Sequence, residues 1–427
     1  MASASLATVS SILKEVYPGM IEDELNNECA LWAILEKSKD QVEGEGKAVI
    51  RPMRVTRNNG IGARVENDTL PTPGAQGYQR ATINMASNYL RGQISNRVMR
   101  SANGGDAAFA DVLEEEIKFG LSDFVSDITR QLYAGAGIIA KVNGAVTAST
   151  SIVVTDVTAF VVGMSVEFWN GATNQTTNDA GLLGTAIVSI NTATNTLVVA
   201  TAQTIATGAT IARQGNNTSA TTTKELQGLD TIVDDGTDYP GFSYFNISRT
   251  TYPILNGNRL DISSASAVPG DSTVILSENK MQYAVDQARR IGGGYVDLFV
   301  TDYNTRRKYS NLLQSNKRYP VEGINGPQFA GGFQRSKDLR TNMAEGLSFD
   351  GAPVIASRLN PAGKMWGLDT SSMKIFQQSD VEWVLNGDSV LHPLMAATGQ
   401  DAYQYSLFYD AQVYCEGPNR NVKMVNC

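Results

Sequence analysis

Histidine is almost missing from this sequence of 427 residues, in which His392 is the single one. A zinc site that uses histidine, or a Ser-His-Asp triad, would have to be built around it. Pro393 follows it directly, and no cysteine or second histidine lies near it in the sequence. We therefore interpret His392 as a packed or surface histidine, and predict no catalytic site, no metal site and no cofactor.

Cysteine and basic charge are also scarce. Cys29, Cys415 and Cys427 lie far apart in no pattern, which predicts free thiols in a protein made in a reducing cytoplasm. The net charge of -8 argues against a dedicated nucleic-acid binder, which needs a basic surface. No apolar run approaches the roughly 20 residues of a membrane span, and we expect no signal peptide.

Apolar residues are plentiful enough for real cores. They make up 42% of the chain against 18% charged residues, and the length suits two or three domains. Residues 1–40 are predicted to form a helical N-terminal arm, broken at Tyr17-Pro18-Gly19. Its second helix carries one apolar stripe that we expect to be buried, often on a neighbouring molecule. The stripe consists of Leu25, Cys29, Trp32 and Leu35.

Residues 41–103 predict a long β-hairpin. The strand-like pieces KAVIRPMRVTR and YQRATINMASNYLRGQISNRVM flank a tip rich in Gly, Asn and Pro. Between residues 41 and 100 there are one Lys and eight Arg against four acids, about +5 in a chain of -8. A two-stranded arm has little core of its own and is marginal alone, so we expect its arginines to find acids on another subunit. A solvated hairpin on a monomer is the alternative.

Residues 104–136 predict one long amphipathic helix. Acidic residues lie early in it, Arg130 lies late, and Gly135 occupies the position of a C-terminal cap. The apolar residues recur at spacings of three and four, as on one helix face. They are Phe109, Leu113, Ile117, Leu121, Phe124, Ile128 and Leu132.

Residues 137–222 have a different composition, rich in Thr, Asn, Ala, Gly and Val, without proline and with only five charged residues. Short alternating runs predict a small all-β module. The runs are SIVVTDVTAF, SVEFWN, TAIVSI, TLVVATA and ATIAR.

Residues 223–370 predict a mixed α/β region. The helix ENKMQYAVDQARRI is capped by Ser277 and stopped by Gly292-Gly293-Gly294, and the strand YVDLFVT and the helix DYNTRRKYSNLLQS follow. Residues 371–427 read as strands (VEWVL, YQYSLFYDAQVYCE). The fold class is therefore α+β.

Several motifs that could suggest chemistry have simpler explanations. GAGIIA at 135–140 follows a helix and precedes strands, whereas a dinucleotide fingerprint needs the opposite order. GEGKAV at 44–49 lacks the remaining residues of a phosphate loop. Asp234-Asp235 suggests a turn, and Glu114-Glu115 the solvent side of a helix start. Paired-acid hydrolysis stays open but nothing favours it.

The order of these segments resembles the major capsid fold of tailed bacteriophages, the Hong Kong 97-like fold. That family has an N-arm, an extended E-loop, a spine helix in a peripheral domain, an axial domain, and a return to the peripheral domain. LQGLDTIVDDG, YVDLFVTDYNTRRKYSNLL and FDGAPVIASRLNPAGKMWGLDTSSMKI resemble parts of the axial domain and of the return segment. The exception, residues 137–222, resembles the β insertion domains of some phage coat proteins.

The resemblance implies a non-enzymatic subunit that self-assembles into the hexamers and pentamers of an icosahedral head shell, made in the host cytoplasm and located in the virion. It implies as partners a separate scaffolding protein, a portal and, as a further candidate, a decoration protein. Some relatives crosslink through an E-loop lysine; here Lys47 lies near the hairpin base, so we predict non-covalent contacts only. The expected inter-subunit residues are Arg51, Arg54, Arg57, Arg64 and Glu66.

Two other functions stay open at this point. The shell protein of an encapsulin-type bacterial nanocompartment shares the fold, although the β insert and the length favour a phage. A glycan-binding or hydrolytic protein that uses the β module belongs to a different class. The insertion module itself is compatible with a folding aid, a lateral contact or an outer decoration.

Overall fold

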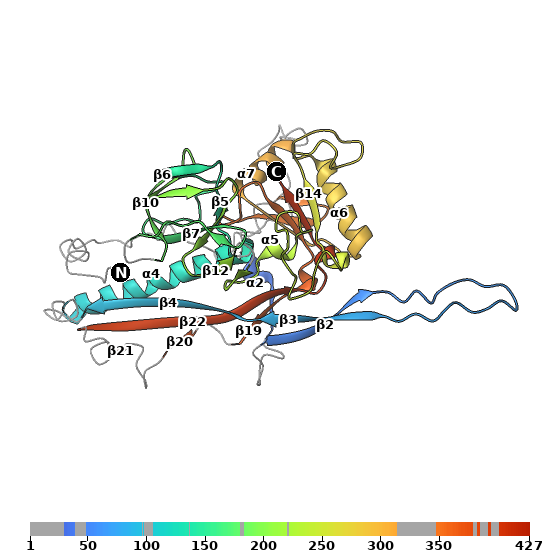
Figure 1. Cartoon of the computed structure of the whole chain (residues 1–427), viewed down its shortest axis with the longest axis horizontal. Coiled ribbons are helices and arrows are strands. Elements are labelled where there is room, and N and C mark those ends of the chain that lie inside the picture. Colours follow the sequence, from blue (N-terminus) through green and yellow to red (C-terminus); the bar gives the residue numbers. More distant parts are fainter. Residues whose placement is uncertain are drawn as a thin grey trace, which may run out of the picture.

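The computed structural model describes residues 30–38, 48–95, 97, 106–135, 137–179, 183–219, 222–313, 347–378, 382–384, 392–393 and 401–427. The described chain forms an elongated body from which a thin arm projects at one end (Figure 1). A long sheet with one long helix runs along the body, and a small barrel and an α/β unit lie side by side over them. Each of these three parts contains a cluster of buried apolar side chains.

The long sheet is organised around one strand, β22 (Ala402–Cys415). Its apolar side chains alternate along the strand, so Tyr405, Leu407 and Tyr409 are buried while Phe408 is half-buried. It pairs antiparallel with β4 (Ala86–Ser95) over the whole of that strand. On its other edge it pairs with β19 (Met373–Gln377), β20 (Glu382–Trp383) and β21 (His392–Pro393).

The predicted long helix is confirmed as α4 (Asp106–Tyr133), which runs along this sheet (Figure 1). Phe124, Ile128 and Leu132 of the expected stripe are buried. Leu121 of the same stripe is 38% exposed. The side chains of Phe109, Leu113 and Ile117 lie outside the described residues. Close packing within the sheet depends on glycine: at Gly92 of β4, a Cβ atom would overlap the ring of Tyr405, its pairing partner on β22.

The arm is a shorter hairpin than the sequence predicts. β2 (Ala48–Thr56) pairs with β3 (Gly77–Asn84), and the chain then changes sheet at Met85, so that the second half of the predicted strand becomes β4. The burial pattern explains the change, since both Ile83 and Ala86 are buried and the alternation of faces is broken between them. The amide of Thr82 donates to the carbonyl of Phe245 (3.1 Å), which fastens β3 to the body.

The N-terminal segment also differs from expectation. A short helix α2 (Ala30–Ile34) is followed by strand β1 (Glu36–Ser38), which pairs in parallel with β19. The second helix of the predicted N-terminal arm therefore ends earlier than expected, at Ile34. Backbone pairing at the sheet edge outweighs the helical preference of Glu36 and Lys37, which are both good helix formers. Leu35 is 3% exposed and belongs to the core of its own chain rather than to a contact with a neighbour. Leu25 and Cys29 lie outside the described residues.

The all-β module is a small closed barrel. Its strand order is β5-β11-β7-β9-β10-β6, and a bridge between Val142 and Val154 joins the two ends. Four of the five predicted runs match strands closely, and SIVVTDVTAF overlaps the end of β6. The strands are β5 (Ala140–Lys141), β6 (Val146–Val153), β7 (Ser165–Asn170), β8 (Thr173–Asn174), β9 (Thr185–Asn191), β10 (Thr196–Ile205) and β11 (Thr210–Arg213).

The α/β unit contains a mixed sheet in the order β14-β23-β18-β15-β17-β16. Its strands are β14 (Asn258–Asp261), β15 (Leu298–Thr301), β16 (Ser348–Phe349), β17 (Ala352–Ala356), β18 (Met365–Leu368) and β23 (Val422–Val425). The tail thus contributes to two sheets, since β22 lies in the long sheet and β23 lies in this one. The remaining short elements are β12 (Asn217–Ser219), β13 (Thr222–Thr223), α5 (Leu229–Ile232), η2 (Pro253–Leu255), η5 (Thr370–Ser372) and η6 (Pro418–Arg420).

The two predicted helices of this unit are confirmed with their caps. α6 (Glu278–Gly292) begins at Ser277, whose hydroxyl accepts from the amide of Lys280 (3.2 Å), and ends at Gly293 with φ of 65°. Only glycine adopts that backbone conformation without strain. α7 (Tyr303–Leu312) begins at Asp302, which caps two amides of its first turn.

Candidate assembly surface

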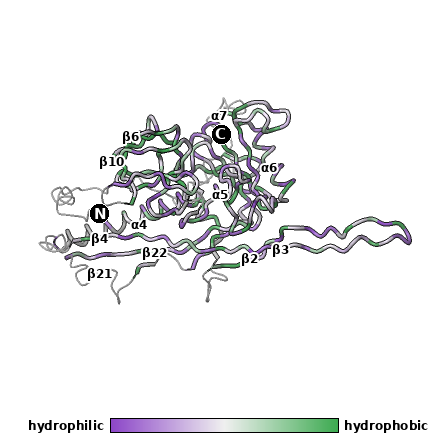
Figure 2. The backbone as a smooth tube through the Cα atoms, viewed as in Figure 1, coloured by the Kyte–Doolittle hydropathy of each residue, from purple (hydrophilic) through white to green (hydrophobic). Residues whose placement is uncertain are grey.

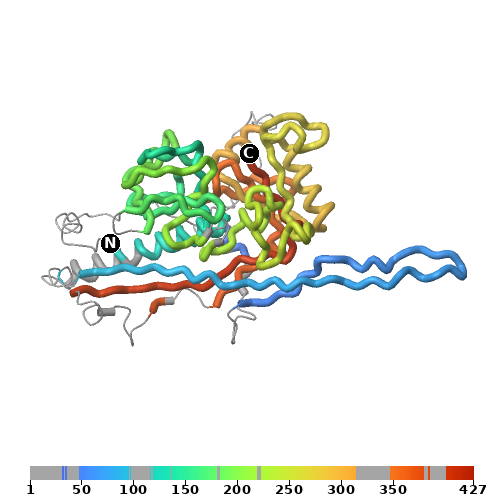
Figure 3. The backbone as a smooth tube through the Cα atoms, in the orientation of Figure 1, coloured from blue at the N-terminus to red at the C-terminus, as the bar shows by residue number. Residues whose placement is uncertain are grey.

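The base of the arm is anchored in the body. One face of the β2–β3 hairpin is buried in the main core, whereas the other faces solvent. The buried residues are Val49, Met53, Val55, Ala81 and Ile83. Beyond Thr56 and Gly77 the two strands no longer pair, and almost all residues from 57 to 76 are exposed as the arm leaves the body (Figure 3).

Local contacts nevertheless shape the tip. The Asn58 side chain accepts from the amide of Gly60 (2.7 Å), and a Cβ atom at Gly74 would overlap Asn58, so the two passes of the chain lie close together. Arg64 donates to the carbonyls of Thr69 (2.7 Å) and Ala63 (2.9 Å). The tip is therefore a folded loop with a defined path, although it has no core beneath it.

The predicted inter-subunit residues divide into three groups. Arg51 is half-buried at the base, with its guanidinium 5.5 Å from the ring centroid of Phe376, so it packs within its own chain. Arg54, Arg57 and Glu66 are exposed along the arm. Arg64 is exposed and lies 3.8 Å from Asp68, which makes a weak surface ion pair inside the tip.

Sequence reasoning based on charge missed the apolar side chains of the same segment. Ile61, Val65 and Leu70 are 86%, 78% and 80% exposed, and Tyr78 is 61% exposed. Apolar stretches thus interrupt an otherwise hydrophilic arm (Figure 2). Large apolar side chains gathered on a projecting loop mark a contact surface, whereas single exposed ones are ordinary. The sequence did contain an indication of this surface, because Ile61, Val65 and Leu70 are large apolar residues in a tip that otherwise consists mainly of turn-forming residues.

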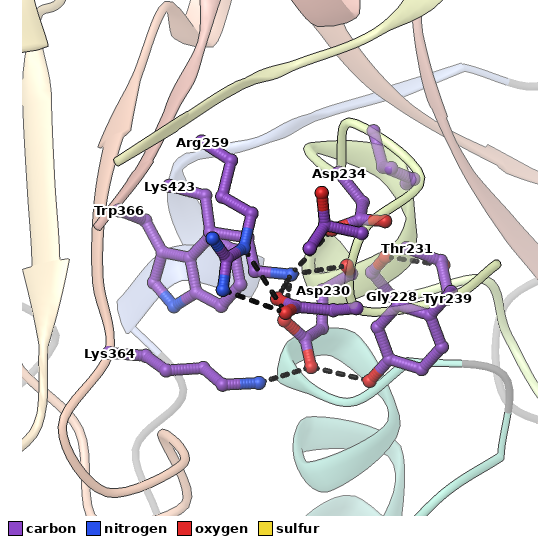
Figure 4. A network of polar contacts seen from close by, with 12 residues as sticks. Gly228, Asp230, Thr231, Asp234, Tyr239, Arg259, Lys364, Trp366 and Lys423 are labelled. Atoms are coloured by element: carbon purple, nitrogen blue, oxygen red, sulfur yellow. Dashed lines mark hydrogen bonds and ion pairs between the residues drawn. The ribbon is translucent and has the colours of Figure 1, made fainter. Parts of the chain in front are cut away.

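A second feature is a buried network of charges where the barrel exit meets the α/β sheet (Figure 4). Lys423 of β23 is fully buried, and its ammonium lies 2.8 Å from Asp230, 3.0 Å from Asp234 and 2.5 Å from Asp238. Asp230 belongs to α5, the first helical turn after the barrel. The network therefore joins segments that lie far apart in the sequence.

Further cations complete this network. Lys364 forms an ion pair with Asp230, which also accepts from the hydroxyl of Tyr239 (2.5 Å). Arg259 of β14 lies 3.0 Å from Asp238. Three carboxylates thus face three cations, which offsets the desolvation that would otherwise make such burial very costly.

The electrostatics follow from this pairing. Burial alone would raise the pKa of Asp230, but Lys364 and Lys423 lower that pKa below its ordinary value. Burial would lower the pKa of Lys423, but the three aspartates raise it. Both groups therefore stay charged at neutral pH, which suits a structural clamp rather than a proton donor or acceptor.

The described residues do not offer an evident catalytic or metal centre. In the described ranges, no group of three or more His, Cys, Asp and Glu side chains is arranged to hold a metal ion. Burial raises the pKa of Cys415 to about 11 and that of Cys427 to about 12, the opposite of what a nucleophilic thiol needs. The His392 side chain, Lys47 and the Glu114-Glu115 side chains lie outside the described residues. None of the described helices combines the length and apolar character required to cross a bilayer.

No protein-family model and no curated protein matches the sequence. Solved structures do match over nearly the whole chain. The capsid of cyanophage A-1(L) is 14% identical, with 99% of both chains covered and a TM-score of 0.55. Lower similarity is found with a structure of Mycobacterium phage Bobi (11% identity, 99% of both chains, TM-score 0.46) and with the capsid of Myoviridae phage XM1 (9% identity, 98% of both chains, TM-score 0.47).

The cyanophage comparison establishes the fold. An arm, a long helix along a sheet and an α/β unit, matched from end to end, define the Hong Kong 97-like fold of tailed-phage capsid proteins, as the order of segments predicted. The chain has the fold of the cyanophage A-1(L) capsid protein.

Proposed function

We propose that this chain is the major capsid protein of a tailed bacteriophage, a structural subunit without enzymatic activity. The observation that carries the proposal is the projecting arm: its exposed apolar residues point away from the described part of the body, so we infer that another copy of the chain covers them. The end-to-end likeness to a phage capsid protein supports the same conclusion.

Assembly then rests on many shallow contacts that symmetry multiplies. The arm from β2 to β3 serves as the E-loop. Residues 104–136 serve as the spine helix of the peripheral domain and residues 223–370 mainly as the axial domain, with residues 137–222 inserted. Closed symmetry repeats each weak contact around the shell, and simultaneous contacts raise the overall avidity far above that of one pair. The shell encloses DNA without sequence-specific binding, in keeping with the net charge of -8.

The same proposal includes the surroundings of the chain. The subunit is made in the bacterial cytoplasm and ends in the virion head. Its partners are a separate scaffolding protein, a portal and, where one exists, a decoration protein, and non-covalent contacts hold the shell together. A phage head is favoured over an encapsulin-type nanocompartment because the matching structure is a phage capsid and because the chain carries an inserted barrel.

Negative-stain microscopy of the expressed chain, with and without a candidate scaffolding protein, tests the proposal. We expect closed particles from the natural sequence and none from the double variant Arg54→Glu/Arg57→Glu, whose circular dichroism spectrum should stay unchanged because both side chains are exposed. The matched control Arg54→Lys/Arg57→Lys keeps both charges and should assemble. A chain that stays monomeric at high concentration under all these conditions refutes the proposal, and particle diameter and DNA content separate a phage head from a nanocompartment.

A further inference from the structure

The arm is joined to the body through two neighbouring residues of β3. The amide of Thr82 donates to the carbonyl of Phe245 (3.1 Å). The carbonyl of Asn84 accepts from the side-chain amide of Gln412 (3.2 Å). Because residues two apart in a strand direct their backbone groups to the same side, both bonds leave the same edge of β3. A single bond at this edge would act as a pivot, whereas two bonds fix the direction of the strand.

The acceptor of the first bond lies in an unusual turn. Phe245 and Asn246 have φ of 44° and 70°, a backbone conformation that large side chains rarely adopt. The Phe245 ring is buried, and its centroid lies 4.8 Å from that of Tyr244 and 5.8 Å from that of Tyr414. A strained turn persists only where its surroundings determine it, so this carbonyl is a fixed point of the body.

The second bond leads to the barrel. Gln412 of β22 is 4% exposed, and both ends of its carboxamide are engaged. Its nitrogen donates to Asn84, whereas its oxygen accepts from the amide of Gln227 (2.8 Å) and from that of Val413 (3.1 Å). Gln227 belongs to residues 223–227, the barrel-exit segment, through which the chain leaves the barrel. One side chain thus connects the arm base, the central strand of the long sheet and the barrel-exit segment.

A cavity separates part of the arm base from the barrel-exit segment. It has a volume of about 340 Å³, and its wall includes Thr82, Asn84, Glu225, Gln227 and Gln412. Side chains in close contact transmit a displacement from one element to the next, and a cavity lacks those contacts. The carboxamide of Gln412 provides a hydrogen-bonded connection between the two sides of this cavity.

We propose that Gln412 positions the arm: its carboxamide sets the direction in which β3 leaves the body and ties that direction to the barrel-exit segment. The inserted barrel thereby restrains an arm that projects at the far end of the body (Figure 1). This role goes beyond the capsid function, because it belongs to the single chain and is measured in the unassembled protein.

Distances between two spin labels measure the direction of the arm. In a Cys29→Ser chain, labels at Tyr78→Cys of β3 and Ile291→Cys of α6 report the arm against the body, since both positions are more than half exposed. Cys415 and Cys427 are buried and should not be labelled. The natural sequence at Gln412 should give one narrow distance distribution by double electron–electron resonance, and circular dichroism checks that each variant is folded.

Gln412→Met removes the hydrogen bonds of the carboxamide at a similar side-chain volume. The distance distribution should broaden, because β3 loses one of its two bonds to the body. Hydrogen exchange of the peptide that contains Gln227 should become about 3- to 10-fold faster, the effect of losing one hydrogen bond.

Gln377→Met is the matched control. Gln377 of β19 is 3% exposed, its carboxamide accepts from the hydroxyl of Tyr409 (2.8 Å), and it lies outside the wall of the cavity. This variant also loses a buried amide and should be destabilised to a similar degree, but its distance distribution should stay narrow. Equal broadening in Gln377→Met would show that any damage to the sheet loosens the arm, and would overturn the role of Gln412.

Gln412→Glu separates the two ends of the carboxamide. It keeps an oxygen that accepts from Gln227 and loses the donor to Asn84. Burial raises the pKa of a carboxyl, so the distance distribution should be broad at about pH 8 and narrow at about pH 5, where the protonated group again donates. The titratable residues in the wall of the cavity are Lys224 and Glu225, so the natural sequence is measured at both pH values and should stay narrow. A distribution independent of pH in Gln412→Glu would overturn the positioning.

Gln227→Pro tests the tie to the barrel, since proline lacks the amide that donates to Gln412. In a folded Gln227→Pro chain the distribution should broaden, although the donor to Asn84 is still present. A narrow distribution in that chain would overturn the tie, and a narrow one in Gln412→Met would overturn the positioning of the arm as a whole. Neither result bears on the capsid proposal, which particle formation by the natural chain decides separately.

Discussion

Replacing Lys423 with methionine keeps the length of the side chain and removes its charge from the buried network. Asp230 would keep Lys364 and Tyr239, and Asp238 would keep Arg259. Asp234, whose side chain is 1% exposed, would lose its ion pair with Lys423. Among the described residues, its carboxylate would keep the hydrogen bond from the amide of Gly236 (2.9 Å). An acid stranded in this way costs about 3–5 kcal/mol, so the free energy of unfolding should fall by that amount.

Urea unfolding of the unassembled chain measures this loss, with Lys224→Met, an exposed lysine, as the control that should change stability by less than about 0.5 kcal/mol. Adding Asp234→Asn removes the stranded charge, and the double variant should recover about 1–3 kcal/mol relative to Lys423→Met alone. The reasoning is wrong if Lys423→Met costs less than about 1 kcal/mol, or if the double variant is no more stable than the single one.

Three further outcomes are expected. Gly92→Ala should lower the free energy of unfolding by about 1–3 kcal/mol, because the new methyl group overlaps the ring of Tyr405. The melting temperature should therefore fall, and an unchanged melting temperature would contradict this packing. Because the pKa of Asp230 is depressed in the folded chain, its stabilisation is complete above its ordinary pKa of about 4 and is lost as the pH falls below that value. Stability measured from pH 5 down to pH 2 should therefore fall, and less steeply in Asp230→Asn. In a Cys29→Ser chain the two buried thiols should react with a thiol reagent only on unfolding, and rapid native labelling would refute their burial.

Much of the fold follows from local signals that act independently of distant contacts. The cap at Ser277 and the left-handed Gly293 define α6 from within a few residues, and the alternation in SVEFWN defines β7. The long helix was predictable because its 28 residues satisfy their own backbone hydrogen bonds. Such elements are correct in the sequence analysis because no tertiary contact has to override them.

The parts that the sequence did not reveal depend on long-range contacts. The chain changes sheet at Met85 because β4 pairs with the edge of β22. The helix ends at Ile34 because the residues after it pair, as β1, with β19. Lys423 gave no signal either, since its three acids come from residues nearly two hundred positions earlier. At the arm, the count of arginines predicted a contact surface, whereas the structure adds its apolar residues and assigns Arg51 to the body.

Strand β22 is synthesised long after the strand with which it pairs. β4 leaves the ribosome first and stays unpaired on that edge until β22 follows, because the two strands are far apart in the sequence. The hydrogen bond between Arg91 and Gln404 (2.6 Å), for example, spans 313 residues. Pairing over such a separation is slow, so the nascent polypeptide carries an open sheet through most of its translation. A product interrupted before residue 402 lacks the central strand of that sheet, so the long sheet can form only in molecules that were translated past it.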